Sequence, residues 1–366
     1  MVLRCGIVGL PNVGKSTIFN AITSAGAQSE NFPFCTIDPN VGAVAVPDDR
    51  LERIHKFVQT DRIVPAELQL VDIAGLVQGA SQGEGLGNKF LGHIKEVEAI
   101  AHVVRCFEDE DVIHVDGAID PVSDIEVIET ELALADLETL ERAYERTSRK
   151  ARSGDKDAIA QAAVFGKAKD AVATGKQLRS LDLSEKEREL LKPLFLLTAK
   201  PVLFVANVSE DDIHAPESCP RYKKVAAYAK AQGARVVAIS GRIEGELSEL
   251  PLEDRREFLK DVGLEEPGLN RLIRETYHLL GLRTFFTAGE IEIRAWTFHE
   301  GDTAPKAAGV IHTDFEQKFI RAEIYRLEDL EEFSSEAGIR SAGKLRTEGK
   351  AYLMQDGDIA HFLIGP

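Results

Sequence analysis

The sequence predicts an α/β domain that is interrupted by a helical hairpin and followed by a smaller α+β domain. Up to about residue 120, short apolar runs alternate with stretches of helical pattern, as expected for a parallel sheet that is buried on both faces. Two more apolar runs begin near residues 201 and 234. The stretch before them has helical spacing of apolar residues and is rich in charged residues and alanine. With 366 residues, the chain is long enough for two or three domains.

Composition and charge describe an ordinary globular protein. Hydrophobic residues make up 44% and charged residues 29% of the chain, and a net charge of -17 argues against a protein that coats nucleic acid nonspecifically. No apolar stretch reaches the roughly 18 residues that span a bilayer, and MVLRCGIVGLP lacks the basic start of a signal peptide. Because Cys5, Cys35, Cys106 and Cys219 lie far apart without a CxxC, we expect no zinc site, no disulfide framework, no membrane association and a cytoplasmic location.

The first strand candidate, LRCGIVGL, leads into a phosphate-binding loop. Residues 9–17 read GLPNVGKST, which satisfies G-x-x-x-x-G-K-[ST], and the helix candidate TIFNAIT follows, so a chance match to a glycine-rich turn is disfavoured. Lys15 is expected to bridge the β- and γ-phosphates and to act in catalysis, and the Ser16 hydroxyl is expected to ligate Mg²⁺. The backbone N–H groups expected to face the phosphates belong to Asn12, Val13, Gly14, Lys15, Ser16 and Thr17.

Three residues downstream of this loop complete a nucleotide switch. Asp72 ends the strand candidate ELQLVDIAG and supplies an acidic group for the metal ion. Gly75 completes D-x-x-G, where its N–H would face the γ-phosphate and report its loss. Thr36, in FPFCTIDPN, is the candidate switch hydroxyl for Mg²⁺, and a plain loop threonine is the alternative. Together these motifs predict a Ras-like P-loop nucleoside triphosphatase domain.

Residues 122–198 predict an antiparallel helical hairpin inserted into this domain. Ile, Leu and Ala recur at helical spacing in DIEVIETELALADLETLERAYERTSRKA, a break follows at Ser153-Gly154-Asp155, and KDAIAQAAVFGKAKDAVATGKQL forms the second helix. The predicted tip is basic. It is either a contact for RNA or a solvated helix end, and its basic residues are Arg142, Arg146, Arg149, Lys150, Arg152 and Lys156.

The strand PVLFVANV resumes the α/β domain and ends at a nucleotide-base loop. GTPases read Asn-Lys-x-Asp at this point, whereas the present chain reads Asn207, Val208, Ser209 and Glu210. This loop is either a degraded guanine site or a site with a different base preference. A further strand, ARVVAISG, leads to the fifth-motif position, where Ser240 is a weak candidate for a base contact and the Gly241-Arg242 pair has no assigned role.

The last part of the chain predicts a small α+β domain. EIEIRAWTF, KAAGVIH, AYLMQ and AHFLIG are strand candidates around one helix candidate, TDFEQKFIRAEIY. The domain ranges expected from the whole sequence are 1–121 with 199–281 for the nucleotide domain, 122–198 for the hairpin and 282–366 for the C-terminal domain.

Several long motifs now identify a family. GLVQGASQGEGLGNKFLGHI, at residues 75–94, resembles the glycine-rich second switch of the Obg family of translation-factor GTPases. With NFPFCTIDPN, HVVRCFEDEDVIHVDG and NVSE, nearly the whole chain is similar to the Obg-like ATPases of that family. The resemblance implies a C-terminal domain similar to TGS domains, which have a ubiquitin-like β-grasp fold. It also implies a preference for ATP, association with the ribosome or its large subunit, and Asn-x-x-Glu in place of Asn-Lys-x-Asp.

The residue chemistry of the base loop agrees with this preference. Guanine offers its N1–H and 2-amino donors to one short carboxylate, whereas adenine lacks the 2-amino group and has an acceptor at N1. Glu210 adds one methylene and shifts its carboxylate out of register for guanine, and Val208 removes the lysine that packs over the base. The amide of Asn207 can bond to the N7/N6 edge of adenine.

The residue that positions the attacking water is the last expectation about the site. In Ras-type sites a glutamine follows D-x-x-G, but here that residue is Leu76, and the family shares this replacement. Gln78 and Gln82 are nearby without a reason to choose either. The resemblance points to His114 in EDEDVIHVDG, whose imidazole can accept or relay a proton, and a structural histidine is the alternative.

The sequence therefore predicts a Mg²⁺-dependent ATPase that acts as a nucleotide switch on the ribosome. We expect a monomer whose basic hairpin tip and TGS-like domain line one cleft for RNA. Two alternatives remain at this point: a GTPase in ribosome assembly, and a nucleotide-gated adaptor whose output is binding.

Overall fold

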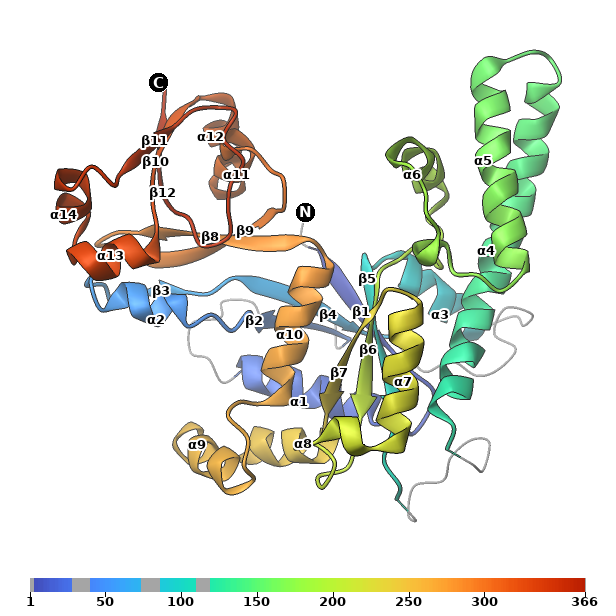
Figure 1. The fold of residues 1–366 in the computed structure, drawn as a ribbon, viewed down its shortest axis with the longest axis horizontal. Helices are drawn as coiled ribbons and strands as arrows, with labels where there is room; N and C mark the ends of the chain where they lie inside the picture. Colours follow the sequence, from blue (N-terminus) through green and yellow to red (C-terminus); the bar gives the residue numbers. More distant parts are fainter. Residues whose placement is uncertain (1–2, 28–39, 74–85, 110–118, 366) are drawn as a thin grey trace. The chain divides into compact units, whose positions relative to one another are not determined.

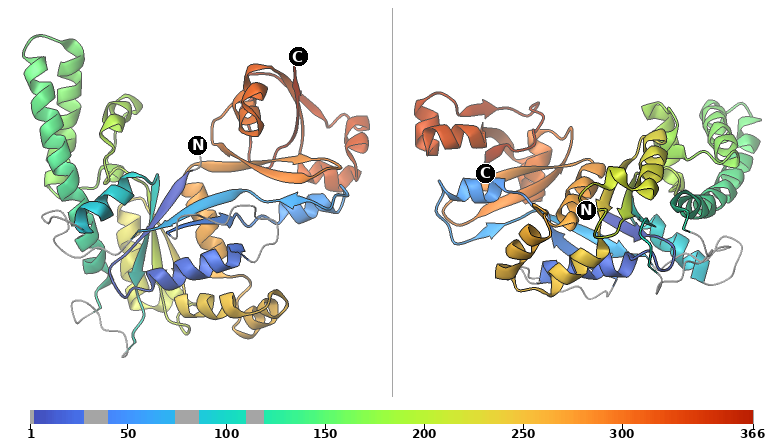
Figure 2. Two further views of the ribbon diagram at one scale, coloured as in Figure 1. Left: turned by 180° about the vertical axis from the view of Figure 1, so that it is seen from behind. Right: turned by 60° about the horizontal axis from the view of Figure 1, so that its bottom comes forward.

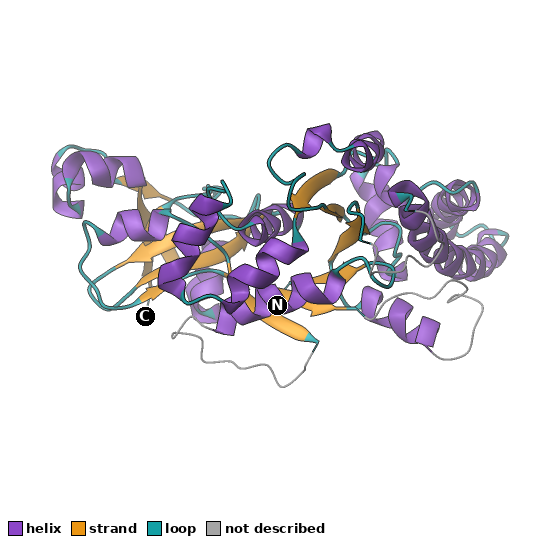
Figure 3. Ribbon diagram, turned by 90° about the horizontal axis from the view of Figure 1, so that it is seen from below, coloured by secondary structure: helices purple, strands orange, loops and turns teal. Residues whose placement is uncertain are grey.

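The computed structural model describes residues 3–27, 40–73, 86–109 and 119–365 (Figure 1). The chain forms two compact units. The first combines the described residues before Ala43 with Gln69–Leu272, and the second combines Ala43–Leu68 with the residues from Ile273 onward. Both units contain helices and strands (Figure 3), which confirms the predicted mixed α/β class.

The first unit is built on a six-stranded sheet with the order β2-β4-β1-β5-β6-β7. The five strands from β4 to β7 in this order run parallel. Every residue of β5 and β6 is buried, as their uninterrupted apolar runs predicted, because helices cover a parallel sheet on both faces. The strands are β1 (Arg4–Val8), β2 (Val41–Ala45), β4 (Glu67–Asp72), β5 (Ala99–Arg105), β6 (Val202–Asn207) and β7 (Arg235–Ile239).

Helices pack against this sheet, and its parallel strands align their carboxyl ends at one edge. Helix α1 contacts α8, and α7 contacts β6 and β7. Ligands of open parallel sheets bind beyond the carboxyl ends of the strands, so this edge is where a site is expected. The helices in this part of the chain are α1 (Lys15–Ala27), α3 (Leu86–Lys95), α7 (Pro220–Ala231), α8 (Gly241–Glu249), α9 (Leu252–Asp261) and α10 (Gly268–Leu279).

The predicted hairpin consists of α4 (Pro121–Ala151) and α5 (Lys156–Ala173), which lie side by side in Figure 2. The Asp120 carboxylate accepts a hydrogen bond from Val122 N at the start of α4, and Asp155 caps α5 in the same way. Gly154 adopts a φ of +86° in the turn between them. The helices bury a shared apolar seam that includes Leu140, Ala143, Phe165, Ala168 and Val172.

The base of the hairpin is fixed by a buried carboxylate. Asp136 of α4 accepts hydrogen bonds from Leu197 N (2.8 Å), Thr198 N (2.7 Å) and Thr198 Oγ1 (2.6 Å). Burial raises the pKa of Asp136, and these three donors oppose that shift. The chain returns from α5 to β6 through the short helices η1 (Leu178–Ser180), α6 (Glu185–Leu191) and η2 (Lys192–Leu194).

The second unit has a mixed six-stranded sheet with the order β11-β10-β12-β8-β9-β3. Strands β8 and β9 form an antiparallel hairpin, β12 lies parallel to β8, and β3 lies parallel to β9. Its strands are β3 (Ile63–Val64), β8 (Leu282–Ala288), β9 (Ile293–His299), β10 (Phe319–Tyr325), β11 (Arg346–Glu348) and β12 (Ile359–Ile364). Its helices are α2 (Arg50–His55), α11 (Ala304–Ile311), α12 (Thr313–Gln317), α13 (Leu327–Phe333) and α14 (Glu336–Ser341).

Three secondary-structure assignments in the C-terminal region were wrong. KAAGVIH lies in helix α11, where Ala304, Ala307 and Ala308 are fully buried at helical spacing. The helix candidate TDFEQKFIRAEIY is helical only in α12 and then forms β10. AYLMQ forms no strand and contributes one isolated bridge, between Thr303 and Leu353. Short apolar runs do not distinguish helix from strand by periodicity alone.

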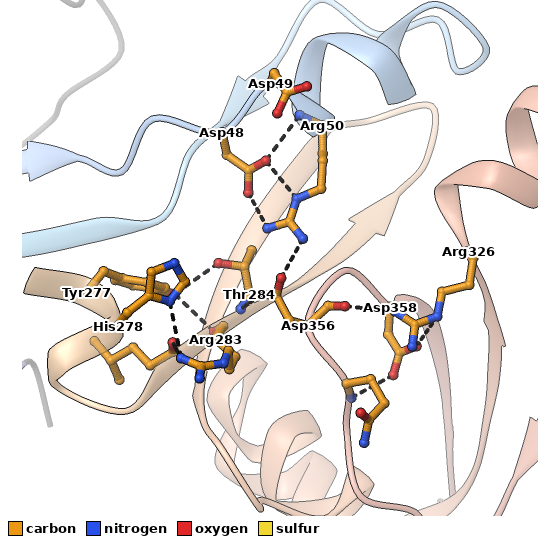
Figure 4. A network of polar contacts seen from close by, with 12 residues as sticks. Asp48, Asp49, Arg50, Tyr277, His278, Arg283, Thr284, Arg326, Asp356 and Asp358 are labelled. Carbon is orange, nitrogen blue, oxygen red and sulfur yellow. Dashed lines mark hydrogen bonds and ion pairs between the residues drawn. The ribbon is translucent and has the colours of Figure 1, made fainter. Parts of the chain in front are cut away.

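An arginine at the start of α2 connects Ala43–Leu68 to the rest of the second unit (Figure 4). Arg50 pairs with Asp48 (2.7 Å) and with Asp356 (2.7 Å), and its guanidinium lies 5.0 Å from the ring centroid of Phe286. Although burial opposes the shift, the side-chain bonds to the two aspartates raise the pKa of Arg50. The guanidinium therefore joins three separate segments of one unit.

The interactions of α2 and β3 extend this connection. Arg53 donates to both carboxylate oxygens of Glu331, at 2.9 and 3.0 Å, and Thr60 Oγ1 donates to Ile291 O at 3.0 Å. The predicted range 1–121 places these residues in the nucleotide domain, whereas their contacts group them with the C-terminal residues. The remaining domain ranges and the likeness to TGS domains stay predictions. Within the described ranges, no helix is long and apolar enough to cross a membrane.

Candidate nucleotide site

The phosphate loop lies between β1 and α1, at the carboxyl edge of the first sheet. Asn12 and Gly14 have positive φ values of 63° and 89°, which turn the chain into the start of α1. A Cβ atom on Gly14 would lie 2.2 Å from Nδ2 of Asn207, so the close approach of Asn207 also requires glycine here. Because α1 begins at Lys15, its unpaired N–H groups and positive dipole end face the loop, as an anion site requires.

Lys15 and Asp72 lie together at this edge. The parallel pairing of β1 with β4 places Asp72 opposite Ile7, and Lys15 Nζ forms an ion pair with Asp72 Oδ1. The two side chains are only 10% and 20% exposed. The structure therefore brings together the predicted phosphate-binding cation and the predicted metal-binding carboxylate, which neutralise each other here.

The described donors at this place fit a magnesium ion better than a softer metal. Ser16 is exposed in the first turn of α1, and Asp72 ends β4, so one hydroxyl and one carboxylate are available. In the described ranges, no three His, Cys, Asp or Glu side chains are grouped so that they could hold a metal ion by themselves. Magnesium is held by a few hard oxygen ligands together with phosphate oxygens and water, which matches this set.

Asn207 joins the phosphate loop to the base loop. It ends β6 and is 4% exposed. Its Nδ2 donates to Val13 O at 2.9 Å, and its Oδ1 accepts from Gly241 N at 2.9 Å. The sequence argument assigned this amide to the base, but its principal contacts in the structure are two backbone groups of the site itself. Each amide atom has capacity for one further hydrogen bond.

A cavity of about 480 Å³ opens beside Asn207. Phosphate-loop residues form one side of it, the ends of β5, β6 and β7 form the rest, and Val208 is 2% exposed within it. Its lining comprises Asn12, Gly14, Thr17, Phe107, Glu108, Asp109, Asn207, Val208, Ser209, Glu210, Asp211, Ser240, Gly241 and Arg242. All members of the predicted base loop therefore meet at one cavity.

Two cavity residues that sequence reasoning did not assign are Arg242 and Phe107. Arg242 Nε lies 2.8 Å from Glu210 Oε1, so the carboxylate expected near the base already has a cationic partner. Phe107 follows β5, and the guanidinium of the buried Arg105 lies 4.7 Å from its ring centroid. The aromatic residue after the apolar run AIAHVVRC was the available sequence signal for Phe107, whereas no local pattern indicated the Arg242 pair.

Three predicted site residues lie outside the described residues. They are Thr36, Gly75 and His114, and the same holds for Leu76, Gln78 and Gln82. Their assigned roles therefore stay predictions.

Comparison with known proteins gives matches along the whole chain. A family model described as "50S ribosome-binding GTPase" matches residues 4–151, and the model YchF-GTPase_C, described as "Protein of unknown function (DUF933)", matches residues 282–365. The chain is 52% identical over 362 residues to the ribosome-binding ATPase YchF of Bacillus subtilis, and 53% identical over 363 residues to that of Escherichia coli O157:H7. Each alignment covers 99% of both chains.

A solved structure agrees with these sequence matches. The YchF GTPase of Schizosaccharomyces pombe superimposes with a TM-score of 0.88 and 40% sequence identity, covering 99% of this chain and 97% of that one. The names of these relatives differ in the nucleotide, since the bacterial proteins are called ATPases and the yeast structure a GTPase.

A buried acid lies in the first turn of α8, four residues after Ser240. Glu244 is 3% exposed, and its Oε1 accepts from Gly268 N at 2.6 Å at the start of α10. Among the described residues, its Oε2 has no hydrogen-bond partner. Burial raises the pKa of Glu244 to about 7, against the opposing effect of the N–H groups of Gly268 and Leu269.

This shift predicts a pH-dependent effect of Glu244→Gln on stability. The folded pKa lies above the unfolded value of 4.5, so ionisation costs the native state free energy as pH rises between about 4.5 and 7. The variant avoids this cost, and its free energy of unfolding relative to wild type should rise by up to about 3 kcal/mol between pH 4.5 and 8. Urea unfolding across this range measures it, with Glu246→Gln on the same helix as control. Parallel pH curves for wild type and Glu244→Gln would contradict the assignment.

Proposed function

The chain belongs to the YchF family, and we propose on that basis that it hydrolyses ATP to ADP and phosphate with Mg²⁺ and binds the ribosome as a nucleotide switch. The full-length similarity to proteins named ribosome-binding ATPases supports both parts of the proposal. We further propose a cytoplasmic monomer that contacts the large ribosomal subunit.

The Glu210–Arg242 contact is the observation that carries the preference for ATP. Guanine requires an anionic acceptor that is available to its N1–H and 2-amino group. Here Glu210 Oε1 lies 2.8 Å from Arg242 Nε, so guanine would have to share this carboxylate with a cation, which leaves fewer acceptor positions for its N1–H and 2-amino group. Adenine has no donor at N1 or C2, so the ion pair can persist beside it. A buried Val208 in place of lysine also removes a cation from the guanine-type motif.

The phosphate loop supplies the groups for phosphoryl transfer. Backbone N–H groups of residues 12–17 would bind the phosphates, and Lys15 would exchange Asp72 for the β- and γ-phosphates. Ser16, Thr36 and Asp72 would hold Mg²⁺, directly or through water, and Gly75 would contact the γ-phosphate. The ion supplies charge neutralisation for the phosphate oxygens when it is bound.

Equilibrium titration with ATP and GTP tests the nucleotide preference. The wild-type protein is expected to bind ATP at least about tenfold more tightly than GTP, because mismatched polar groups in a base site discriminate strongly. The double substitution Val208→Lys with Glu210→Asp should narrow that ratio by restoring the guanine-type loop. Tighter binding of GTP by wild type would refute the proposal and favour the GTPase alternative.

His114 is the residue that we propose to position the attacking water, because Leu76 has no hydrogen-bonding group. His114→Ala should lower kcat for ATP hydrolysis by about 10-fold or more, with an unchanged Kd for ATP. Gln78→Ala and Gln82→Ala are the matched controls within the second switch. Full turnover in His114→Ala, or a parallel loss of ATP binding, would exclude this role.

The hairpin tip is the proposed contact for ribosomal RNA. Arg142 and Arg149 pair with glutamates one turn earlier, at Glu138 and Glu145. By contrast, Arg146 and Arg152 are exposed and have no ion pair within the described residues. Part of the basic surface is thus already neutralised on the helix, and the remaining cations are available to phosphates. The TGS-like domain is proposed as a second RNA contact.

Charge reversal at the tip tests this contact. Replacing Arg146, Arg149 and Arg152 with Glu should weaken ribosome binding and make it less dependent on salt. The slope of log binding constant against log salt concentration should become shallower by nearly one unit for each phosphate that the protein no longer neutralises. A control with the same charge change replaces Lys223, Lys230 and Lys260 with Glu on α7 and α9. Equal binding of the tip variant and wild type at all salt concentrations would assign these arginines to solvation. Repeating the assay with ATP, ADP and no nucleotide tests gating.

A further inference from the structure

Ser240 carries a buried hydroxyl that has no partner in the described part of the protein. The residue is 2% exposed, lies between β7 and α8, and lines the cavity beside Asn207. Within the described residues its Oγ forms no hydrogen bond. Burying an unpaired hydroxyl costs free energy, so a partner supplied by a ligand would remove that cost.

The usual local role of a serine at this position does not account for the hydroxyl. Ser240 is the N-cap residue of α8, and N-cap serines commonly accept a hydrogen bond from an N–H group in the first turn. Its side chain makes no such bond, and only its backbone carbonyl contacts the helix, accepting from Glu244 N at 3.1 Å. The hydroxyl is therefore not used to cap the helix.

Four other polar side chains that line the cavity already have partners. The Glu210 carboxylate pairs with Arg242, and Ser209 Oγ donates to Asp212 Oδ2 at 2.8 Å. Glu108 forms an ion pair with Arg221, and the amide of Asn207 bonds to two backbone groups. Ser240 differs from these four because its side chain is buried and forms no hydrogen bond within the described residues.

We propose that the Ser240 hydroxyl contacts the nucleobase and accepts a hydrogen bond from the 6-amino group of adenine. The inference rests on the proposed binding of an adenine nucleotide and extends it to one specificity-determining atom. A hydroxyl oxygen offers two acceptor positions, so it can take an N–H of the amino group. Base readers commonly contact this edge through hydrogen bonds.

Ser240 and Thr276 carry buried hydroxyls without a partner among the described residues, which allows a matched comparison. Thr276 on α10 is fully buried, its Oγ1 has no partner among the described residues, and it does not line the cavity. Removing either hydroxyl should stabilise the nucleotide-free protein. Removing only the Ser240 hydroxyl should weaken nucleotide binding.

The experiment measures Tm without nucleotide, and Kd for ADP and for purine riboside 5′-diphosphate, which lacks the 6-amino group. Ser240→Ala should raise Tm by about 1–2 °C and weaken ADP about fivefold, while its affinity for the analogue stays close to that of wild type. Thr276→Val should raise Tm and leave both Kd values unchanged. Calorimetry with the diphosphates avoids turnover during the measurement.

Two results would overturn the inference. One is an unchanged Kd for ADP in Ser240→Ala, and the other is an equal loss for ADP and the analogue, which would remove the amino group from the contact. The comparison does not depend on which base binds more tightly. A preference of wild type for GDP over ADP would therefore refute the proposed function separately, and the Ser240 result would still be read from ADP and its analogue.

Discussion

The two hydrogen bonds of the Asn207 amide are the contacts on which the nucleotide site depends. One holds Val13 of the phosphate loop and the other holds Gly241 at the start of α8, so a single side chain fixes the distance between the phosphate and base subsites. The approach is so close that a Cβ atom on Gly14 would overlap the amide. Because Asn207 ends a fully buried strand, the central sheet sets the position of both loops. Rigid elements hold a binding geometry more precisely than loops do.

A second constraint concerns the chain between β2 and β4. Both strands belong to the sheet of the nucleotide unit, and β4 ends at Asp72. The residues between them belong instead to the second unit, where Arg50 joins Asp48 to Asp356 and β3 pairs with β9. The chain therefore passes from the nucleotide sheet to the second unit after β2 and returns to the sheet at β4. A third connection runs through α10. This arrangement gives the C-terminal unit a short covalent path to the carboxylate beside Lys15.

The first unit and the hairpin could be predicted from the sequence because each of their segments has the hydrophobic pattern of one type of secondary structure. The apolar runs at β1, β4, β5, β6 and β7 end in glycine or a polar or charged residue, and α4 and α5 carry helical spacing over many turns. The C-terminal unit was harder because its elements are short, so KAAGVIH and FIRAEIY were assigned to the wrong classes. The phosphate loop was readable because its residues are adjacent in the sequence, whereas the ion pair of Lys15 with Asp72 joins two separate motifs. The contacts of Asn207 with Val13 and of Arg242 with Glu210 join residues far apart in sequence or without a known motif, so local patterns did not contain them.

Charge pairing explains how an acidic protein can hold a polyanion. The main ionic groups of the site are neutralised within the protein, Lys15 by Asp72 and Glu210 by Arg242. A nucleotide that takes Lys15 from Asp72 forms one ion pair and breaks another, so the net Coulomb gain is smaller than a single Lys–phosphate contact suggests. In the proposed function, the released Asp72 carboxylate would hold Mg²⁺, so the ion would bind together with the phosphates rather than before them. The backbone N–H groups at the start of α1 carry no net charge, so a phosphate can bind them without breaking an ion pair within the protein.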